Sequence, residues 1–238
     1  MLFKKLKFLH SFHLVDGSPW PFLLSLNVLG LAFGFLLVLH KHEGGLDLFF
    51  LSLILCFVIF ILWWRDVIRE GTFLWCHTKN VQKNLRFGMI LFILSEIMFF
   101  FSFFWAFFHS SLVPSYIIGG VWPPFYLILF SSLGIPLVNT VLLLTSGLTV
   151  TMSHYFVRYY QNLEKNRSLF YLFLTILLAF LFLFLQFYEY CAAFFTISDG
   201  IYGSLFYLLT GFHGFHVLIG TFFLLVCFFR LLFNHFFF

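Results

Sequence analysis

The strongest constraint in this sequence is a set of long apolar runs that contain almost no charged side chains. An ordinary soluble domain carries about 25% charged residues, whereas this chain carries 9% and is 62% hydrophobic. Such a chain cannot cover a water-facing surface. Runs of about 20 apolar residues are long enough to cross the hydrocarbon core of a bilayer as helices. The sequence therefore predicts an all-α integral membrane protein.

Six runs have the length of membrane-crossing helices. Their expected bounds are about Pro19–Leu39, Leu46–Trp64, Val81–Leu112, Ile135–Tyr160, Ser168–Tyr190, and from the TISDG sequence at Thr196 to about Asn234. The third and sixth runs exceed what a bilayer needs, so we expect them to tilt or to project beyond it. We expect one membrane domain over residues 1–238, with two helices over 19–64 and four over 81–234.

The basic residues predict the orientation of these helices. If six helices alternate in direction, every lysine and arginine except Lys41 falls on one face of the membrane. The positive-inside rule places that face towards the compartment of synthesis, so both termini are expected there. The net charge of +4 is then a topology signal, and no nucleic-acid partner is needed to explain it.

A single acid, Glu96, lies in the aromatic run SEIMFFFSFFWAFFHS at residues 95–110. A carboxylate in hydrocarbon is costly, so such a group usually faces a protein interior, where burial favours its neutral form. Three interpretations remain open: a proton-relay acid, a polar tie between helices, or a protonated acid hydrogen-bonded to a neighbouring helix.

A polar and aromatic stretch, WWRDVIREGTFLWCHTKNVQKNLRFG, follows the second apolar run. Trp63 and Trp64 suit the headgroup level of a membrane. Charged and polar side chains that follow in the sequence can bind lipid phosphates through charge-assisted hydrogen bonds. They are Arg65, Arg69, Glu70, His77 and Lys79. The alternative is a solvated loop with anchoring tryptophans.

No catalytic residues and no metal site are predicted within the chain. Its four cysteines form no CxxC pair, and the sequence lacks a P-loop, a dinucleotide fingerprint and a nucleophile elbow. His213 and His216 lie three residues apart, on one face of a helix. They could form half of a metal or haem site, but no partner pair accompanies them; the alternative is hydrogen bonding between helices.

Several colinear stretches resemble one family. They are HLVDGSPWPF, WWRDVIREGTF, VQKNLRFGMILFILSEIMFFFSFFWAFFHSSL, GGVWPP, PLVNTVLLLTSG and FTISDGIYGSLFYLLTGFHGFHVLIGTFFLLVCFFR. Together they run from about His10 to His235 and resemble subunit III of mitochondrial cytochrome c oxidase. Because many motifs occur in order over nearly the whole chain, this resemblance is specific.

The resemblance implies a core oxidase subunit that carries no redox centre, with haem a and copper in partner subunits. It implies packing against subunit I and other subunits of complex IV, support of proton uptake, and a V-shaped, phospholipid-binding cleft between the first two helices and the larger bundle. It assigns the buried acid to Glu96 and lipid headgroup contacts to Arg69, Glu70, His77 and Arg230. It also implies the mitochondrial inner membrane, with both termini in the matrix.

The chain departs from the family pattern in three places. In the family, a basic residue commonly lies three positions after the residue that matches Arg230; here that position is Phe233. The GHH sequence that commonly follows the REGT-type motif reads LWCH here, so only His77 is kept. The family normally continues through an HHFGFE-type stretch into a seventh helix. We expect a separate polypeptide to supply that helix, or a truncation whose space is filled by lipid or an accessory helix.

Two other functions remain open from the sequence. One is the third subunit of a bacterial haem-copper oxidase. The other, from a different class, is a small polytopic transporter, for which substrate flux through the purified chain would be the distinguishing observation.

Overall fold

Long helices account for nearly all regular structure in the part of the chain that the computed structural model describes, residues 12–159 and 164–236. They are α1 (Trp20–Leu39), α2 (Gly45–Thr72), α3 (Lys79–Leu112), α4 (Ile135–Tyr159), α5 (Lys165–Cys191) and α6 (Gly200–Leu232), with a short 3₁₀ helix, η1 (Tyr116–Ile118), between α3 and α4. All six α-helices are long and apolar enough to cross a membrane. The predicted six-helix membrane protein is confirmed.

The observed bounds match the expected ones within a few residues, except at the end of α2. We expected this helix to end near Trp64, but it continues to Thr72. The apolar run does end at Trp64, yet arginine and glutamate are good helix formers, so the backbone continues as helix after hydrophobicity falls. Tyr160, the expected last residue of the fourth helix, lies outside the described residues.

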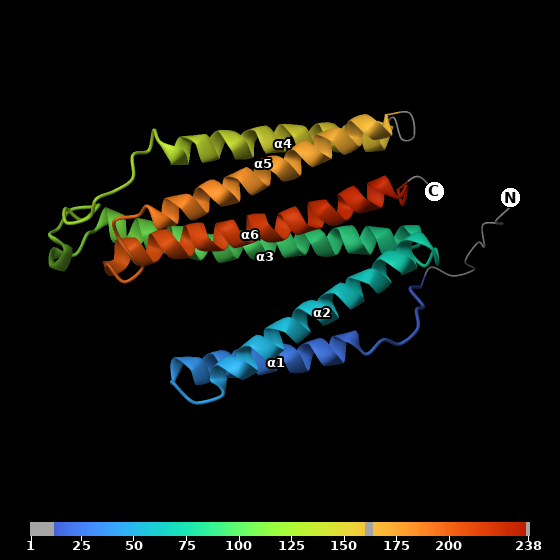
Figure 1. The fold of residues 1–238 in the computed structure, drawn as a ribbon, viewed down its shortest axis with the longest axis horizontal. Coiled ribbons are helices and arrows are strands. Elements are labelled where there is room, and N and C mark those ends of the chain that lie inside the picture. Colours follow the sequence, from blue (N-terminus) through green and yellow to red (C-terminus); the bar gives the residue numbers. More distant parts are fainter. Residues whose placement is uncertain (1–11, 160–163, 237–238) are drawn as a thin grey trace, which may run out of the picture. The chain divides into compact units, whose positions relative to one another are not determined.

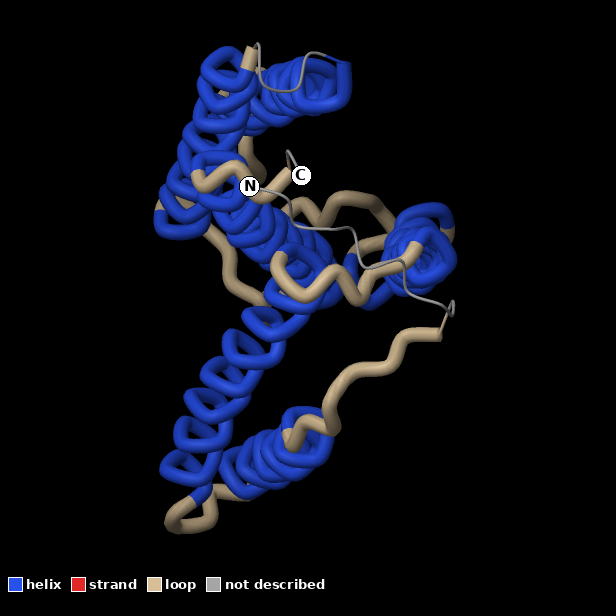
Figure 2. The backbone as a smooth tube through the Cα atoms, turned by 90° about the vertical axis from the view of Figure 1, so that its right-hand side faces the viewer, coloured by secondary structure: helices blue, strands red, loops and turns tan. Residues whose placement is uncertain are grey.

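The chain divides into two compact units, Met1–Leu91 and Phe92–Phe238, and the division falls within α3. In the first unit, α1 and α2 run side by side as an antiparallel hairpin (Figures 1 and 2). Gly44, with a φ of 79°, permits the tight turn between them, because a side chain rarely adopts this left-handed conformation.

Two glycines spaced four apart allow α1 to approach α2 closely. A Cβ at Gly34 would lie 2.7 Å from the backbone nitrogen of Phe49, and a Cβ at Gly30 would lie 2.7 Å from Ser52 Oγ. Small residues at this spacing commonly mark helix contacts in membranes, where van der Waals packing replaces the hydrophobic effect. The hairpin therefore depends on the absence of a side chain at Gly34, where the neighbour is backbone; at Gly30 the neighbour is a serine hydroxyl, which can rotate.

In the second unit, α5 packs against both α4 and α6. Hydroxyl groups join α4 to α5: Ser153 Oγ donates to the Ser168 carbonyl at 2.9 Å, and the Thr149 and Thr175 hydroxyls lie 2.8 Å apart. An apolar cluster around Leu172 and Leu231 joins α5 to α6. The specific contacts in this bundle are thus short polar bonds within an apolar surround.

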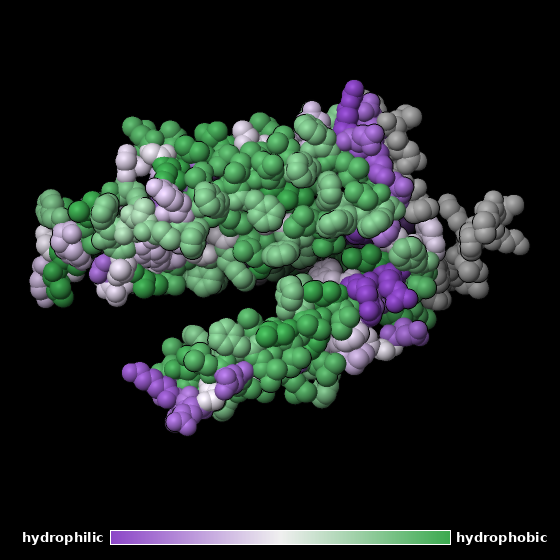
Figure 3. Space-filling view, in the orientation of Figure 1, coloured by the Kyte–Doolittle hydropathy of each residue, from purple (hydrophilic) through white to green (hydrophobic). Residues whose placement is uncertain are grey.

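Apolar side chains cover the visible sides of the helices, and hydrophilic side chains gather near their ends (Figure 3). In the helices α1, α3 and α4, at most 6% of the most apolar 18-residue window is buried within the chain. In a membrane protein such a surface faces lipid or other subunits, because no aqueous surface could accommodate it.

We predict that Gly34→Ala destabilises the α1–α2 hairpin. The new methyl group would meet the backbone of α2, which cannot rotate away, and overpacking of this kind costs about 1–3 kcal/mol. Gly88→Ala in α3 is the matched control, because a Cβ there meets nothing within 4 Å and alanine favours the helix. Thermal denaturation in detergent should show a lower midpoint for Gly34→Ala alone. Equal midpoints for the two variants would contradict the prediction.

Candidate functional site

The extension of α2 places polar side chains on its last two turns. Asp66 accepts a hydrogen bond from the Trp20 indole nitrogen at 2.7 Å, which joins the first turn of α1 to α2. Arg65 donates to the other oxygen of the same carboxylate, from Nη2 at 2.9 Å and from Nε at 3.1 Å. Both oxygens of Asp66 are therefore occupied, and the start of α1 is fixed against α2.

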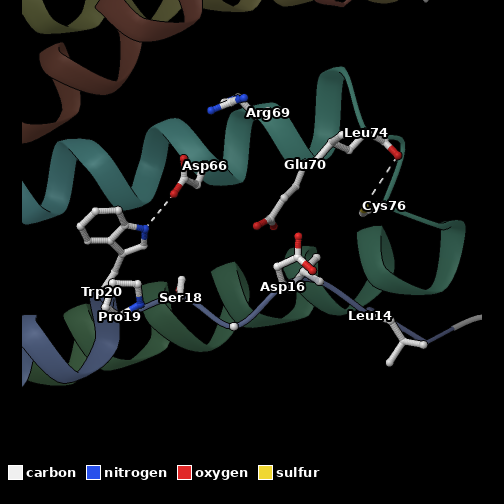
Figure 4. A pocket seen from close by; sticks show the side chains of 12 residues that line it. Leu14, Asp16, Ser18, Pro19, Trp20, Asp66, Arg69, Glu70, Leu74 and Cys76 are labelled. Atoms are coloured by element: carbon white, nitrogen blue, oxygen red, sulfur yellow. Dashed lines mark hydrogen bonds between the residues drawn. The ribbon is translucent and has the colours of Figure 1, made fainter.

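A cavity of about 360 Å³ lies beside this bond. Figure 4 shows Glu70 extending from α2 towards Asp16, which belongs to the segment that precedes α1. The charged residues that line the cavity are Asp16, Asp66, Glu70 and Arg69. Three carboxylates and one guanidinium group give the cavity an acidic lining.

Five of the six expected lipid-binding residues lie in the Met1–Leu91 unit, on α2 or directly after it: Trp63, Trp64, Arg69, Glu70 and His77. Trp64 and Arg69 are exposed, whereas Glu70 and His77 are half-buried. Arg230, at the end of α6, belongs to the other unit, where its guanidinium carbon lies 4.6 Å from the centre of the Phe236 ring. The convergence of Arg230 with Arg69 stays a prediction.

Within the described residues, one group of side chains has donor atoms close enough together to share a metal ion. It consists of His13, Glu70 and His77, whose ligand atoms all lie within 4.8 Å of one another. His13 Nε2 lies 3.7 Å from Glu70 Oε2, and the centres of the two imidazole rings are 5.4 Å apart. Neither His213 nor His216 belongs to such a group, so the structure gives no support to a metal site at that pair.

Cys76 lies next to His77 but is a poor candidate for a further ligand. Burial raises the pKa of its thiol, and the nearby carboxylates of Glu70 and Asp16 raise this pKa further. The thiolate is the form that binds metal, and the raised pKa disfavours this form in the absence of an ion. Its Sγ atom lies 3.6 Å from the Leu74 carbonyl oxygen.

In the second unit, Glu96 of α3 lies against His216 of α6. Glu96 Oε2 and His216 Nε2 are 2.6 Å apart, across 120 residues of sequence. The other ring nitrogen of His216, Nδ1, lies 2.6 Å from the Phe212 carbonyl oxygen one turn earlier. Both ring nitrogens therefore have a partner, and the acid is tied to a neighbouring helix.

Aromatic rings surround this pair. The centres of the His216 and Phe100 rings are 5.1 Å apart. The Phe99 and Phe212 rings meet edge-on, with their centres 5.0 Å apart. The side chains of His216 and Glu96 are 33% and 31% exposed in the chain alone, so lipid or another subunit is needed to shield them fully. The aromatic rings shield one side of the hydrogen bond.

Four residues that the structure singles out were not predicted from the sequence. Asp66 and Trp20 form a bond over 46 residues, and His13 joins Glu70 and His77 over an even longer separation. Glu189, near the end of α5, is only 5% exposed; a lone acid beside an apolar run, as at Glu96, was a signal that could have identified it. The other three carry no local pattern.

The comparisons with known proteins agree on one family. Residues 10–237 match the family model described as cytochrome c oxidase subunit III. The protein named cytochrome c oxidase subunit 3 from Prototheca wickerhamii is 53% identical over 95% of this chain and 86% of its own length. Proteins of the same name from Chondrus crispus and Drosophila yakuba are 53% and 50% identical, over 94% and 95% of this chain and 81% and 85% of their own lengths. The chain therefore belongs to the cytochrome c oxidase subunit III family.

Proposed function

We propose that the chain supports the catalytic subunit I of cytochrome c oxidase in the mitochondrial inner membrane, with both termini in the matrix. In this role it holds phospholipids and supports proton uptake while electrons pass from cytochrome c to oxygen. Membership of the family, over residues 10–237, is the observation that carries the proposal. As an oxidase subunit, the chain is part of an oxidoreductase, and neither the transporter nor the bacterial subunit is favoured.

The apolar surface supports a role within an assembly. The most apolar window of α3 contains no buried residue, although this helix carries the acid of the Glu96–His216 pair. A helix that is apolar all round is normally buried in a large protein or in a membrane. We propose that subunit I and other complex IV subunits, together with lipid, cover this surface.

Haem a and copper belong, in this proposal, to partner subunits. The four cysteines of the chain form no CxxC pair in the sequence and are free thiols. The two histidines of α6 have other contacts. His216 bonds to Glu96, and the His213 ring packs edge-on against the Phe182 ring, with the ring centres 5.8 Å apart. These contacts suit a supporting subunit better than a redox centre.

The Glu96–His216 pair is suited to holding a proton. The Phe212 carbonyl can only accept a hydrogen bond, so His216 Nδ1 carries a hydrogen. One further proton then lies between Nε2 and the Glu96 carboxyl: the pair is either a neutral acid and imidazole or a carboxylate and an imidazolium. We propose the neutral form, because apolar surroundings disfavour separated charges, and we propose that this shared proton is how Glu96 supports proton uptake.

The headgroup site is proposed at the end of α2. Arg69 is exposed there and can bond a lipid phosphate, while the Glu70 carboxylate oxygen other than Oε2, which faces His13, can accept hydrogen bonds from headgroup hydroxyls. Trp63 and Trp64 lie within two turns of Arg69 and suit the membrane interface. Arg230 is proposed to bind the same lipid from the end of α6.

We expect the chain, carrying an affinity tag, to co-purify with haem a and copper in a fixed ratio. Difference absorption spectra and metal analysis of the purified complex measure this directly. Purification of the chain as a folded protein without haem-containing partners would contradict the proposed assembly.

We predict that Glu96→Gln leaves assembly largely intact but abolishes labelling by a hydrophobic carbodiimide, which reacts with protonated carboxyl groups. The amide fills nearly the same volume and can still bond to His216. The part of the infrared carboxyl band that comes from protonated Glu96 should disappear at the same time. The exposed Glu43 is the control, and Glu43→Gln should retain both signals. Unchanged labelling in Glu96→Gln would show that another acid reacts.

We predict that Arg69→Gln lowers the retention of one phospholipid in the purified complex. A hydrogen bond to a charged group contributes about 1.5–3 kcal/mol, so affinity should fall roughly tenfold or more. Native mass spectrometry counts the bound lipids. Arg86→Gln in α3 is a control that removes the same charge from an exposed position.

Arg230→Gln tests whether the two arginines share that lipid. Loss of the same lipid species, with no additional species lost in the double variant, is the expected result. Loss of two different lipids would contradict the convergence of Arg69 and Arg230.

A further inference from the structure

The cluster of His13, Glu70 and His77 has the chemistry of a transition-metal site. Zinc binds imidazole nitrogen and carboxylate oxygen at 2.0–2.2 Å, so neighbouring donor atoms in a tetrahedral site lie roughly 3.4 Å apart. His13 Nε2 and Glu70 Oε2 are already 3.7 Å apart, and all three donors lie within 4.8 Å of one another. Small side-chain rotations would bring them to binding distance.

The backbone holds His77 in place for this role. A Cβ at Gly71 would lie 2.8 Å from His77 Nδ1 and 3.0 Å from Cε1, so the imidazole ring rests directly on the glycine. The Cys76 amide donates to the Glu70 carbonyl at 3.0 Å, and Gln82 Nε2 donates to the His77 carbonyl at 3.1 Å. These bonds fix the turn after α2, and with it the histidine.

The charge of the neighbouring cavity favours a cation. Its lining carries Asp16, Asp66 and Glu70 against the single positive charge of Arg69. Asp66 is occupied by Trp20 and Arg65, which leaves Asp16 and Glu70 to contribute most of the negative potential. The His13 side chain is 38% exposed, so an ion can reach the cluster from solvent.

We propose that His13, Glu70 and His77 form a binding site for a divalent transition-metal ion such as Zn²⁺. Two imidazoles and a carboxylate suit zinc, whereas Mg²⁺ prefers oxygen ligands. Three protein ligands leave a fourth position for water. The bound ion would fasten the segment before α1 to the turn between α2 and α3, within one compact unit. This site does not depend on the proposed oxidase function.

The first test counts zinc in the purified, tagged complex. Wild-type complex and the variants His13→Ala and His77→Ala are stripped with a mild chelator, equilibrated with Zn²⁺ and analysed by mass spectrometry of the metal content. Each variant should bind one zinc fewer than wild type. The control, His42→Ala, removes an exposed histidine from the α1–α2 turn and should not change the count. An equal zinc content in wild type and His13→Ala overturns the proposal.

The second test keeps all three ligands and moves one of them. Gly71→Ala should push the His77 ring aside and weaken zinc binding roughly tenfold to a hundredfold, as loss of a positioning contact does at other metal sites. Calorimetric titration with Zn²⁺, and with Mg²⁺ as the comparison ion, measures this. Equal zinc affinities in Gly71→Ala and wild type, or Mg²⁺ binding as tight as Zn²⁺ binding, would overturn the assignment.

Arg69→Gln separates this site from the lipid site. Arg69 is not a zinc ligand, so this variant should bind zinc at least as well as wild type, whereas His13→Ala should lose zinc and retain the phospholipid. Loss of zinc in Arg69→Gln together with the phospholipid would show that the metal reaches the complex through the lipid, and would overturn a site made by the three side chains.

Discussion

The absence of water in the membrane interior is the constraint on which the rest of the structure depends. Backbone groups there must bond to one another, and helices satisfy them within a single segment. Apolar burial contributes little to holding these helices together, because lipid covers apolar side chains as well as protein does. The contacts that decide how the helices pack are therefore close backbone approaches and short polar bonds.

Both kinds of contact are present, one dominating in each unit. The α1–α2 hairpin relies on close approach at Gly30 and Gly34. The second unit relies on polar bonds, such as Tyr190 to Thr210 at 2.7 Å and the Ser153–Ser168 contacts. The Glu96–His216 bond belongs to the same class but contains a titratable acid. The Glu96–His216 pair thus differs from an ordinary interhelical hydrogen bond in that its side chains can gain or lose a proton.

The sequence predicted the six helices well because hydrophobicity reports directly on membrane crossing. It missed the last two turns of α2, where helix propensity continues after hydrophobicity has ended. Glu96 was recognisable because an acid stands out in an aromatic run, but its partner was not, since 120 residues separate it from His216. The grouping of His13 with Glu70 and His77 was likewise not predictable, because these residues come together only after the chain has folded. The Gly30–Gly34 spacing was a local signal that could have been used.

The longer α2 also explains how the two proposed ligands, a phospholipid and a divalent metal ion, can use adjacent residues. Successive residues on an α-helix point about 100° apart, so Arg69 and Glu70 face different directions. Arg69 is exposed, whereas Glu70 is half-buried and extends towards Asp16 (Figure 4). An anionic phosphate can therefore approach the guanidinium while a cation approaches the carboxylate. If α2 ended at Trp64, as its hydrophobicity suggested, no helical backbone would hold the Arg69 guanidinium and the Glu70 carboxylate in different directions.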